Sequence, residues 1–242
     1  MESVSLNVGE VLSGKRVLFT GCTGFLGKVT LSMLLHRYGE QLDRVHVLVR
    51  KGSSATAQQR FFDKVVTGEP FAPIRQARGE EGALAFLKTK CAVHQGDIAS
   101  ERLGLSPALL EELRGRVDLV INCAGLVSFN PSLELGLNVN TIGVRHVVDA
   151  CLTLGARLVH VSTTFVAGNR SGLVFEDEEI RGYFPKKDEL DGRDFSLEQE
   201  LLDCQKLVTR LREMAEDKAL TSTFRQKAID RLTEEGRDRN DE

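Results

Sequence analysis

The sequence predicts an α/β fold in which a doubly wound parallel sheet is covered by helices on both faces. Five short apolar runs rich in β-branched residues alternate with segments of helical periodicity, a pattern typical of parallel sheets. The first run leads directly into closely spaced glycines and then into a helix. The chain has 242 residues, 41% of them hydrophobic, and can therefore bury one core of the required size.

Each predicted element follows from its residue pattern. The apolar runs predict strands over residues 17–20, 45–49, 91–94, 119–122 and 158–162. Apolar residues three and four positions apart predict helices over residues 26–37, 57–66, 107–114 and 141–154. Residues 67–81 are rich in proline and glycine, and we interpret them as a loop.

A glycine-rich turn follows the first strand, in the sequence RVLFTGCTGFLG of residues 16–27. Glycines at this spacing, between a strand and a helix, let the backbone approach the pyrophosphate of a dinucleotide, whose negative charge the amino end of the helix favours. The turn therefore predicts a Rossmann-type domain that binds a dinucleotide. The residues expected to contact it here are Gly21, Thr23, Gly24, Phe25, Leu26 and Gly27.

The second strand ends in Arg50-Lys51, where an NAD-binding protein usually carries an acidic residue for the ribose 2′-hydroxyl. A guanidinium and an ammonium group instead suit a 2′-phosphate, because charge-assisted hydrogen bonds to phosphate are strong. We therefore predict NADP(H) as the cofactor, with Ser53, Ser54 and Arg60 as further contacts. The alternative is a solvated basic strand end that binds nothing.

Acidic and small residues follow the third and fourth strands. Asp97 and Ile98 come after the third, where a carboxylate can accept a hydrogen bond from the adenine amino group and an apolar side chain can cover the ring. Cys123, Ala124 and Gly125 follow the fourth, and their small side chains leave room for the ribose and nicotinamide. An ordinary strand-to-loop connection would explain the same residues without a ligand.

The fifth strand ends in three hydroxyl residues, Ser162, Thr163 and Thr164, in the sequence HVSTTFVAG. Ligands of open α/β sheets bind at the carboxyl ends of the strands. A hydroxyl group beside the nicotinamide could donate a hydrogen bond to a carbonyl oxygen and stabilise the charge that develops there. Serine and threonine are also common in loops, so these residues indicate a catalytic site only in combination with the preceding motifs.

Beyond residue 168 the sequence becomes acidic and polar. Residues 1–170 hold 19 basic and 15 acidic residues, whereas residues 171–242 hold 13 and 20. Ser196 and Gln199 form a candidate capping box for one helix, and residues 224–232 follow the spacing of a second. We predict an NADP-binding domain over residues 1–170 and a mostly helical insertion or lid over residues 171–242, leading to a C-terminal part beyond this chain.

Composition disfavours several classes of site and partner. The five cysteines are odd in number and lack CxxC spacing, and the five histidines show no ligand spacing, so we expect neither disulfides nor a metal. The net charge of −3 does not suggest a nucleic-acid partner. No apolar run approaches the roughly 18 residues that cross a bilayer, and no signal peptide is recognisable, so we expect a cytoplasmic protein.

In this order, the motifs resemble those of the fatty acyl-CoA reductases, whose reductase domain is of the male-sterility type, within the extended short-chain dehydrogenase/reductase superfamily. The resemblance covers residues 12–170 and rests on TGCTGFLG, LVRK, GDI, NCAGLVSFNPSLELGLNVNTIG and HVSTTFVAG. It implies an oxidoreductase of lipid metabolism that uses NADPH to reduce a long-chain acyl-CoA thioester to an aldehyde, and in some members to an alcohol. It also allows transient membrane contact without a transmembrane segment.

The resemblance further implies roles for single residues. Thr163 corresponds to the family's catalytic hydroxyl residue, with Ser162 and Thr164 as neighbours that could take the same role. Asn140 corresponds to the asparagine on the helix behind the site. The sequence departs from the family pattern at Val144, where a threonine is usual.

The family's catalytic tyrosine and lysine are the difficulty. Tyr183 and Lys187 have the required Tyr-x-x-x-Lys spacing, but Pro185 would interrupt the helix that must present both side chains on one face. The favoured interpretation is that the chain ends before the true pair. We then expect this fragment to bind cofactor but to reduce substrate poorly or not at all, since acid catalysis is typically worth about 10²- to 10⁴-fold in rate.

Other functions remain open. A reductase of carrier-protein thioesters would use the same domain on a different substrate arm. A nucleotide-sugar epimerase would share the fold, but that class makes little use of a 2′-phosphate site. The chain could also be a non-catalytic NADP(H)-binding module. A cysteine-nucleophile dehydrogenase is disfavoured, because no general-base carboxylate can be placed beside Cys123.

Overall fold

The computed structural model describes residues 7–128, 130–168, 171–178, 191–192 and 194–234. Its contacts group the chain into two compact units. The first unit comprises Met1–Pro131 and Leu135–Ser162, and the second comprises Ser132–Glu134 and Thr163–Glu242.

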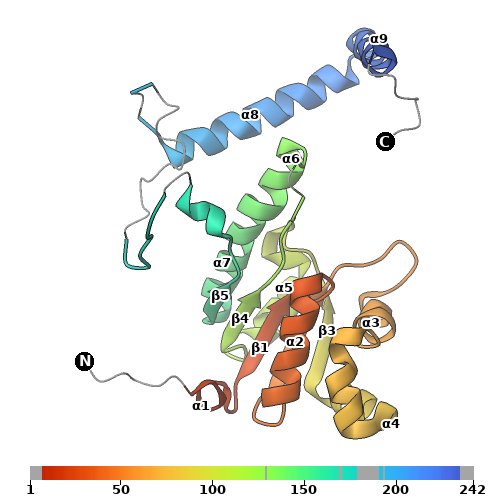
Figure 1. Cartoon of the computed structure of the whole chain (residues 1–242), viewed down its shortest axis with the longest axis vertical. Coiled ribbons are helices and arrows are strands. Elements are labelled where there is room, and N and C mark those ends of the chain that lie inside the picture. Colours follow the sequence, from red (N-terminus) through yellow and green to blue (C-terminus); the bar gives the residue numbers. More distant parts are fainter. Residues whose placement is uncertain (1–6, 129, 169–170, 179–190, 193, 235–242) are drawn as a thin grey trace. The chain divides into compact units, whose positions relative to one another are not determined.

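The first unit is built on a sheet of five parallel strands in the order β3-β2-β1-β4-β5, which confirms the predicted fold class (Figure 1). The order reverses beside β1, because β2 lies on one side of it and β4 on the other. Such a switch point opens a crevice at the carboxyl ends of the strands. The strands are β1 (Arg16–Thr20), β2 (Arg44–Val49), β3 (Cys91–Gln95), β4 (Leu119–Asn122) and β5 (Arg157–His160).

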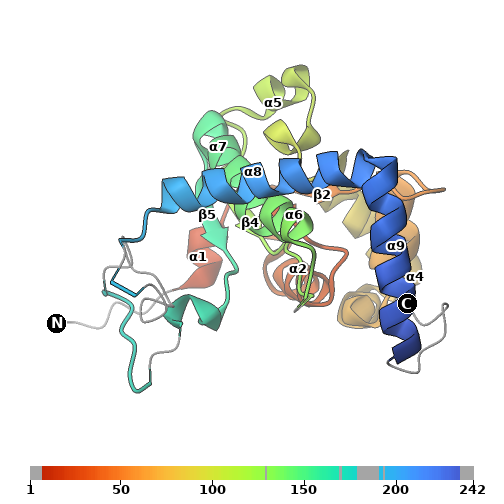
Figure 2. The ribbon, with the colours of Figure 1, turned by 90° about the horizontal axis from the view of Figure 1, so that it is seen from above.

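Helices cover the two faces of this sheet (Figure 2). On one face lie α2 (Phe25–Tyr38) and α4 (Ala72–Lys90), and on the other lie α5 (Pro107–Leu113) and α7 (Gly143–Leu154). Alternate strand residues enter two separate cores, so Phe19 packs on the α2 side and Leu18 on the α7 side. The shorter elements of the whole chain are α1 (Val8–Leu12), α3 (Ala57–Gln59), η1 (Arg60–Val65), η2 (Glu69–Phe71), η3 (Glu101–Gly104), α6 (Leu133–Gly136), η4 (Leu137–Ile142) and η5 (Thr164–Ala167), of which η5 belongs to the second unit.

The prediction of a loop over residues 67–81 is wrong. This segment forms η2 and the first part of α4, with its prolines in the opening turns, where a missing N–H leaves no hydrogen bond unmade. Phe71 and Ile74 are almost fully buried and hold the segment against the core. Gly79, with φ of +71°, interrupts the helical backbone within α4. Proline and glycine here mark a helix start and a kink.

Two predicted boundaries also differ from the structure. The fifth strand ends at His160 and not at residue 162, because β4 ends at Asn122, whose carbonyl accepts the last ladder hydrogen bond from the Val161 N–H, at 2.9 Å. The helix predicted over residues 57–66 is a short α-helical turn, α3, that continues as the π-helix η1. The other three predicted helices correspond to α2, α5 and α7.

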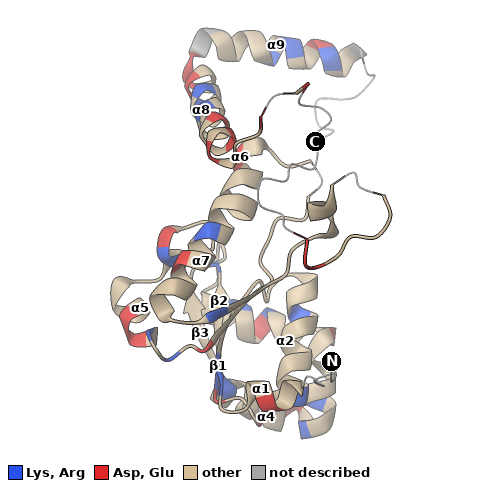
Figure 3. Ribbon diagram, turned by 90° about the vertical axis from the view of Figure 1, so that its left-hand side faces the viewer, with Lys and Arg blue, Asp and Glu red and all other residues tan. Residues whose placement is uncertain are grey.

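Two long helices form most of the described second unit: α8 (Leu197–Glu216) and α9 (Lys218–Glu234). The Ser196 hydroxyl accepts a hydrogen bond from the Gln199 N–H at 3.2 Å, but the Gln199 side chain donates to Asp203, so half of the predicted capping box forms. Acidic and basic residues both occur along α8 (Figure 3). No helix among the described residues combines the length and the apolar character that a bilayer crossing needs.

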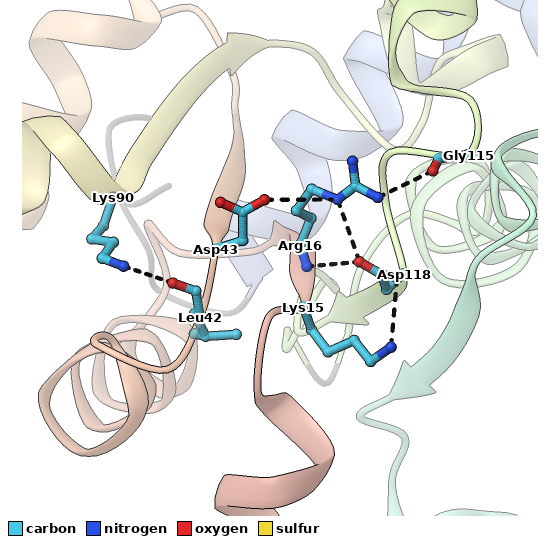
Figure 4. A network of polar contacts seen from close by, with 7 residues as sticks. All are labelled: Lys15, Arg16, Leu42, Asp43, Lys90, Gly115 and Asp118. Carbon is cyan, nitrogen blue, oxygen red and sulfur yellow. Dashed lines mark hydrogen bonds and ion pairs between the residues drawn. The ribbon is translucent and has the colours of Figure 1, made fainter.

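A polar network joins the amino ends of β1 and β4, at the edge of the sheet opposite the switch-point crevice (Figure 4). The Asp118 carboxylate accepts a hydrogen bond from the Arg16 N–H at 2.8 Å and lies 3.7 Å from the Lys15 ammonium group. The Arg16 guanidinium group also donates to the Gly115 carbonyl at 3.2 Å. The Arg16 N–H, helped by the two cations, holds the pKa of Asp118 below its usual 3.8.

We expect Asp118→Ala to lower the free energy of unfolding by about 1–2 kcal/mol at pH 7, the value of a partly buried hydrogen bond to a charged group. The pKa of Asp118 is lower in the folded than in the unfolded chain, so its contribution is complete above the unfolded pKa and is lost as the pH falls through the folded pKa. Urea unfolding at pH 7 and at pH 3 should therefore show a gap between the variant and the parent that narrows in acid. Asp118→Asn, which keeps an acceptor, should cost less; a gap independent of pH would contradict the charge-based explanation.

Candidate cofactor site

The turn between β1 and α2 is packed so closely that two of its positions accept only glycine. Gly21 has a φ of +80°, and a Cβ atom there would lie 2.4 Å from the carbonyl carbon of Cys123 at the end of β4. A Cβ on Gly27, in the first turn of α2, would lie 2.1 Å from the Gly21 carbonyl oxygen. The helix therefore sits directly on the turn, and the turn directly on the sheet.

Gly24 differs from both of these glycines, because a Cβ there would meet only the Gly21 carbonyl oxygen, at 3.5 Å. Gly24 caps α2 without any side-chain hydrogen bond, and within the described chain the N–H groups of Phe25, Leu26 and Gly27 have no acceptor. Unpaired N–H groups and the positive end of the helix dipole attract anions. The open space before α2 therefore fits the pyrophosphate of a dinucleotide.

A cavity of about 280 Å³ lies at the carboxyl ends of β1 and β4, beside this turn. The structure brings most of the predicted cofactor residues together in its wall: Gly21, Thr23, Gly24, Arg50, Asp97, Ile98, Cys123, Ala124 and Gly125. Phe25, Leu26 and Gly27 are not in the wall, and the side chains of Phe25 and Leu26 are exposed. The wall also has an apolar part that no sequence motif indicates, formed by Leu48, Leu126, Leu135 and Val139.

A second, basic cavity of about 780 Å³ adjoins the first, since Arg50, Gly96 and Asp97 line both. Its other walls contain Lys51, Ser53, Ser54 and Arg60, the residues that the sequence suggests for contacts to a 2′-phosphate, together with Lys64, Gln95 and Ser100, for which the sequence gives no such indication. The Arg60 guanidinium group donates to the Arg50 carbonyl at 2.5 Å. Arg60 therefore ties the end of β2 to η1, and the cavity lies between these elements.

Asp97 lies on the wall shared by the two cavities and is held in one orientation. Its carboxylate accepts a hydrogen bond from the Ala99 N–H at 3.0 Å, and its own N–H donates to the Leu103 carbonyl at 2.9 Å. Gly96 is equally constrained, because a Cβ there would lie 2.4 Å from both the Leu103 oxygen and a Leu48 methyl carbon. The loop after β3 thus presents the Asp97 carboxylate on a rigid backbone.

A row of polar side chains supports the cavity floor at the last residues of β1, β4 and β5; those of Thr20 and Asn122 are buried, whereas that of His160 is exposed. Thr20, Asn122 and His160 are register partners across the three strands. The Asn122 amide oxygen accepts hydrogen bonds from the Thr20 hydroxyl and from the Ala124 N–H, and its nitrogen lies 3.0 Å from His160 Nδ1. Since the amide nitrogen can only donate, His160 Nδ1 is the acceptor in this hydrogen bond. The row fixes where the backbone leaves β4 for the cavity wall.

Asn140, predicted as a catalytic residue, lies in the π-helix η4 and binds the backbone of the loop after β4. Its amide oxygen accepts from the Leu126 N–H at 2.8 Å and its nitrogen donates to the Leu126 carbonyl at 2.9 Å. Both polar groups of the side chain are engaged in this way. Asn140 thus holds in place the loop that carries Ala124 and Gly125.

The predicted catalytic hydroxyls fall at the boundary between the two units. Ser162 is the last residue of the first unit, and Thr163 begins the main segment of the second. The Thr163 hydroxyl accepts a hydrogen bond from the Phe165 N–H at 3.2 Å and caps η5, which contains Thr164. Tyr183 and Lys187 lie outside the described residues. The predicted cofactor residues lie in the first unit, where the structure brings most of them together, whereas Thr163 and Thr164 belong to the second unit.

The cysteines nearest the cofactor turn are protonated at neutral pH. Burial raises the pKa of the Cys22 thiol to about 12, and burial also raises the pKa of Cys123. A thiol in this state is a poor nucleophile and a poor metal ligand. Among the described residues no three His, Cys, Asp or Glu side chains are grouped so that they could hold a metal ion.

The chain is similar in sequence to fatty acyl-CoA reductases of plants. The chain is 32% identical over 203 residues to probable fatty acyl-CoA reductase 5 of Arabidopsis thaliana and 31% identical over 230 residues to the alcohol-forming fatty acyl-CoA reductase of Simmondsia chinensis. These alignments cover 82% and 92% of this chain but 40% and 45% of the two relatives. The chain therefore spans less than half the length of these curated relatives.

Solved structures of reductase domains share the fold. The terminal R domain of the myxalamid PKS-NRPS biosynthetic pathway has a TM-score of 0.55 and 27% identity, with coverage of 69% of this chain and 40% of that chain. The reductase (R) domain of a nonribosomal peptide synthetase from Mycobacterium tuberculosis has a TM-score of 0.53 and 26% identity, with coverage of 69% and 38%. Residues 19–230 match the NAD-binding family profile described as male sterility protein. The chain belongs to this male sterility family of NAD-binding domains.

Proposed function

We propose that this chain is the cofactor-binding part of an NADPH-dependent reductase that converts long-chain acyl-CoA thioesters to aldehydes, and in a second reduction to alcohols. The observation that carries the proposal is the pair of adjoining cavities, one at the glycine turn and one lined by Arg50, Lys51, Arg60 and Lys64. The names of the relatives, fatty acyl-CoA reductases of two plants, supply the substrate class.

Each part of the cofactor has a matching surface in the first unit. The pyrophosphate would lie before α2 at Gly24, and the adenine against Asp97 and Ile98. Arg50 and Lys51 would bind the 2′-phosphate, since both line the basic cavity and guanidinium and ammonium groups form charge-assisted hydrogen bonds to phosphate. The nicotinamide ribose would lie along residues 123–125, whose small side chains leave room for it. When bound, the cofactor supplies the hydride.

The remaining residues would orient the reacting carbonyl. Thr163, with Ser162 and Thr164 beside it, would donate a hydrogen bond to the carbonyl oxygen and stabilise its developing negative charge. Asn140 would act as a positioning residue through the Leu126 backbone. In this assignment residues 1–170 bind the cofactor, and residues 171–242 form a mostly helical insertion or lid.

A second candidate substrate is a thioester on a carrier protein. The structural similarity to reductase domains of peptide synthetase pathways favours it. The two candidates differ in the substrate arm and share the same cofactor chemistry. Oxidation of NADPH with an acyl-CoA, compared with the same acyl group on a carrier protein, separates them in a protein that spans the full length of the relatives.

The assignment of NADPH is tested at Arg50. We expect Arg50→Ala to weaken NADPH binding by about tenfold or more while NADH binding stays unchanged, because a lost hydrogen bond to a charged group is worth about 1.5–3 kcal/mol. Calorimetric titration of the chain with both cofactors measures the difference. Arg37→Ala, an exposed arginine in the last turn of α2, is the matched control. Equal weakening of both cofactors would remove the 2′-phosphate assignment.

A further inference from the structure

The basic cavity carries more positive charge than one phosphate group requires. Arg50, Lys51 and Lys64 form no ion pair with any described carboxylate. One guanidinium nitrogen of Arg60 donates a hydrogen bond to the Arg50 carbonyl, and this contact does not neutralise the guanidinium group. In the described wall, Asp97 is the one carboxylate opposing these four cations. The cavity therefore has a marked preference for anions.

The cations approach the cavity from two directions. Arg50 and Lys51 follow β2 directly, whereas Arg60 and Lys64 lie one turn apart on η1. Their side chains are long, and Arg50, Lys51 and Lys64 are exposed, so their charged ends can follow a phosphate over several ångströms. Hydroxyls of Ser53, Ser54 and Ser100 add donors on the same walls. A wall of this kind binds a ribose phosphate mainly through its charge. It therefore discriminates little between phosphates on neighbouring ribose carbons.

The substrate class and the cofactor share the group that this site recognises. NADP(H) carries adenosine with a 5′-diphosphate and a 2′-phosphate, and coenzyme A carries adenosine with a 5′-diphosphate and a 3′-phosphate. The 2′-phosphate of NADP(H) and the 3′-phosphate of coenzyme A are thus attached to neighbouring carbons of the same ribose ring. The adenine wall at Asp97 and Ile98 and the anion site before α2 are common to both ligands.

We propose that free coenzyme A, the product released from the thioester, competes with NADPH by placing its 3′-phosphorylated adenosine in the basic cavity. The inference rests on the proposed function, which supplies both ligands. Reduction of an acyl-CoA would then slow as free coenzyme A accumulates, and added NADPH would relieve the inhibition.

The experiment titrates the chain with adenosine 2′,5′-bisphosphate, adenosine 3′,5′-bisphosphate and adenosine 5′-monophosphate. We expect the two bisphosphates to bind within about tenfold of one another, both more than tenfold tighter than the monophosphate, and to displace each other. Arg50→Ala and Lys64→Gln combined should weaken both bisphosphates and leave the monophosphate unchanged, whereas Arg37→Ala should change none of them.

The outcomes separate this inference from the proposed function. Tight binding of the 2′,5′-bisphosphate, with the 3′,5′-bisphosphate no better than the monophosphate, would overturn the competition by coenzyme A and leave the NADPH assignment standing. Binding of both without mutual displacement would overturn it as well. Failure of the 2′,5′-bisphosphate itself would overturn the NADPH assignment and the inference together.

Discussion

Replacement of Gly27 by alanine is expected to destabilise the first unit by about 3 kcal/mol or more, at the upper end of the range for overpacking a tight site. The new methyl group would lie 2.1 Å from the Gly21 carbonyl oxygen, 2.6 Å from the Gly21 carbonyl carbon and 3.1 Å from the Cys22 nitrogen. All three atoms belong to backbone, so no side-chain rotation relieves the clash. Since α2 covers one face of the sheet, any shift of the helix also opens the core around Leu31 and Leu35.

Urea unfolding followed by circular dichroism measures this loss, and Gly82→Ala provides the matched control. Gly82 lies in α4, where a Cβ would meet only the Arg78 Cβ, at 3.5 Å. This second alanine should be neutral or should stabilise the chain by up to about 1 kcal/mol, because alanine favours helix more than glycine does. Equal stability of the two variants would show that α2 does not rest on the turn as described.

Gly24→Val is expected to weaken the binding of NADPH and of NADH by about 100-fold or more, which abolishes it at ordinary cofactor concentrations, while the fold survives. The valine Cβ has no neighbour closer than the Gly21 carbonyl oxygen, at 3.5 Å, and the Gly24 backbone is extended, with φ of −78° and ψ of 167°, which valine readily adopts. Its two methyl groups would occupy the space before the free N–H groups of α2, where close backbone approach to the phosphates is needed. The loss of several phosphate hydrogen bonds justifies the magnitude.

Calorimetric titration with both cofactors tests this prediction, with the unfolding curve of the same variant as its control. Gly24→Ala, with one added carbon, should weaken binding less than valine does. Unchanged affinity of Gly24→Val would remove the turn from the cofactor site. Loss of the unfolding transition would instead show that position 24 resembles position 27, contrary to the space observed around it.

Sequence patterns correctly predicted those elements whose local conformational preference matches the structure that they adopt in the packed fold. The strands β1 to β4 and the glycine turn are such cases, since apolar runs and glycine spacing carry their own structural meaning. The loop prediction for residues 67–81 was wrong because prolines in the opening turns of a helix look the same in sequence as prolines in a loop. The burial of Phe71 and Ile74 decides between the two structures. That burial depends on partners distant in the chain, which no local window contains.

The same distinction applies to the candidate site. Residues next to a strand end, such as Arg50, Asp97 and Gly125, could be selected from sequence, because the carboxyl edge of a parallel sheet collects them. The polar row of Thr20, Asn122 and His160 was missed, although its signal was present, as all three end their strands and become register partners in a parallel sheet. Lys64 could not be selected, since its place at the cavity depends on the path of η1.

The short strand β5 has a practical consequence for every titration suggested above. In the described part of the chain it pairs with β4 alone, and the side chains of Val159 and Val161 are 50% and 41% exposed. A sheet edge of this kind is a template for self-association between copies. Affinities should therefore be measured at several protein concentrations, and a dissociation constant that drifts with concentration would report edge-to-edge pairing superimposed on ligand binding.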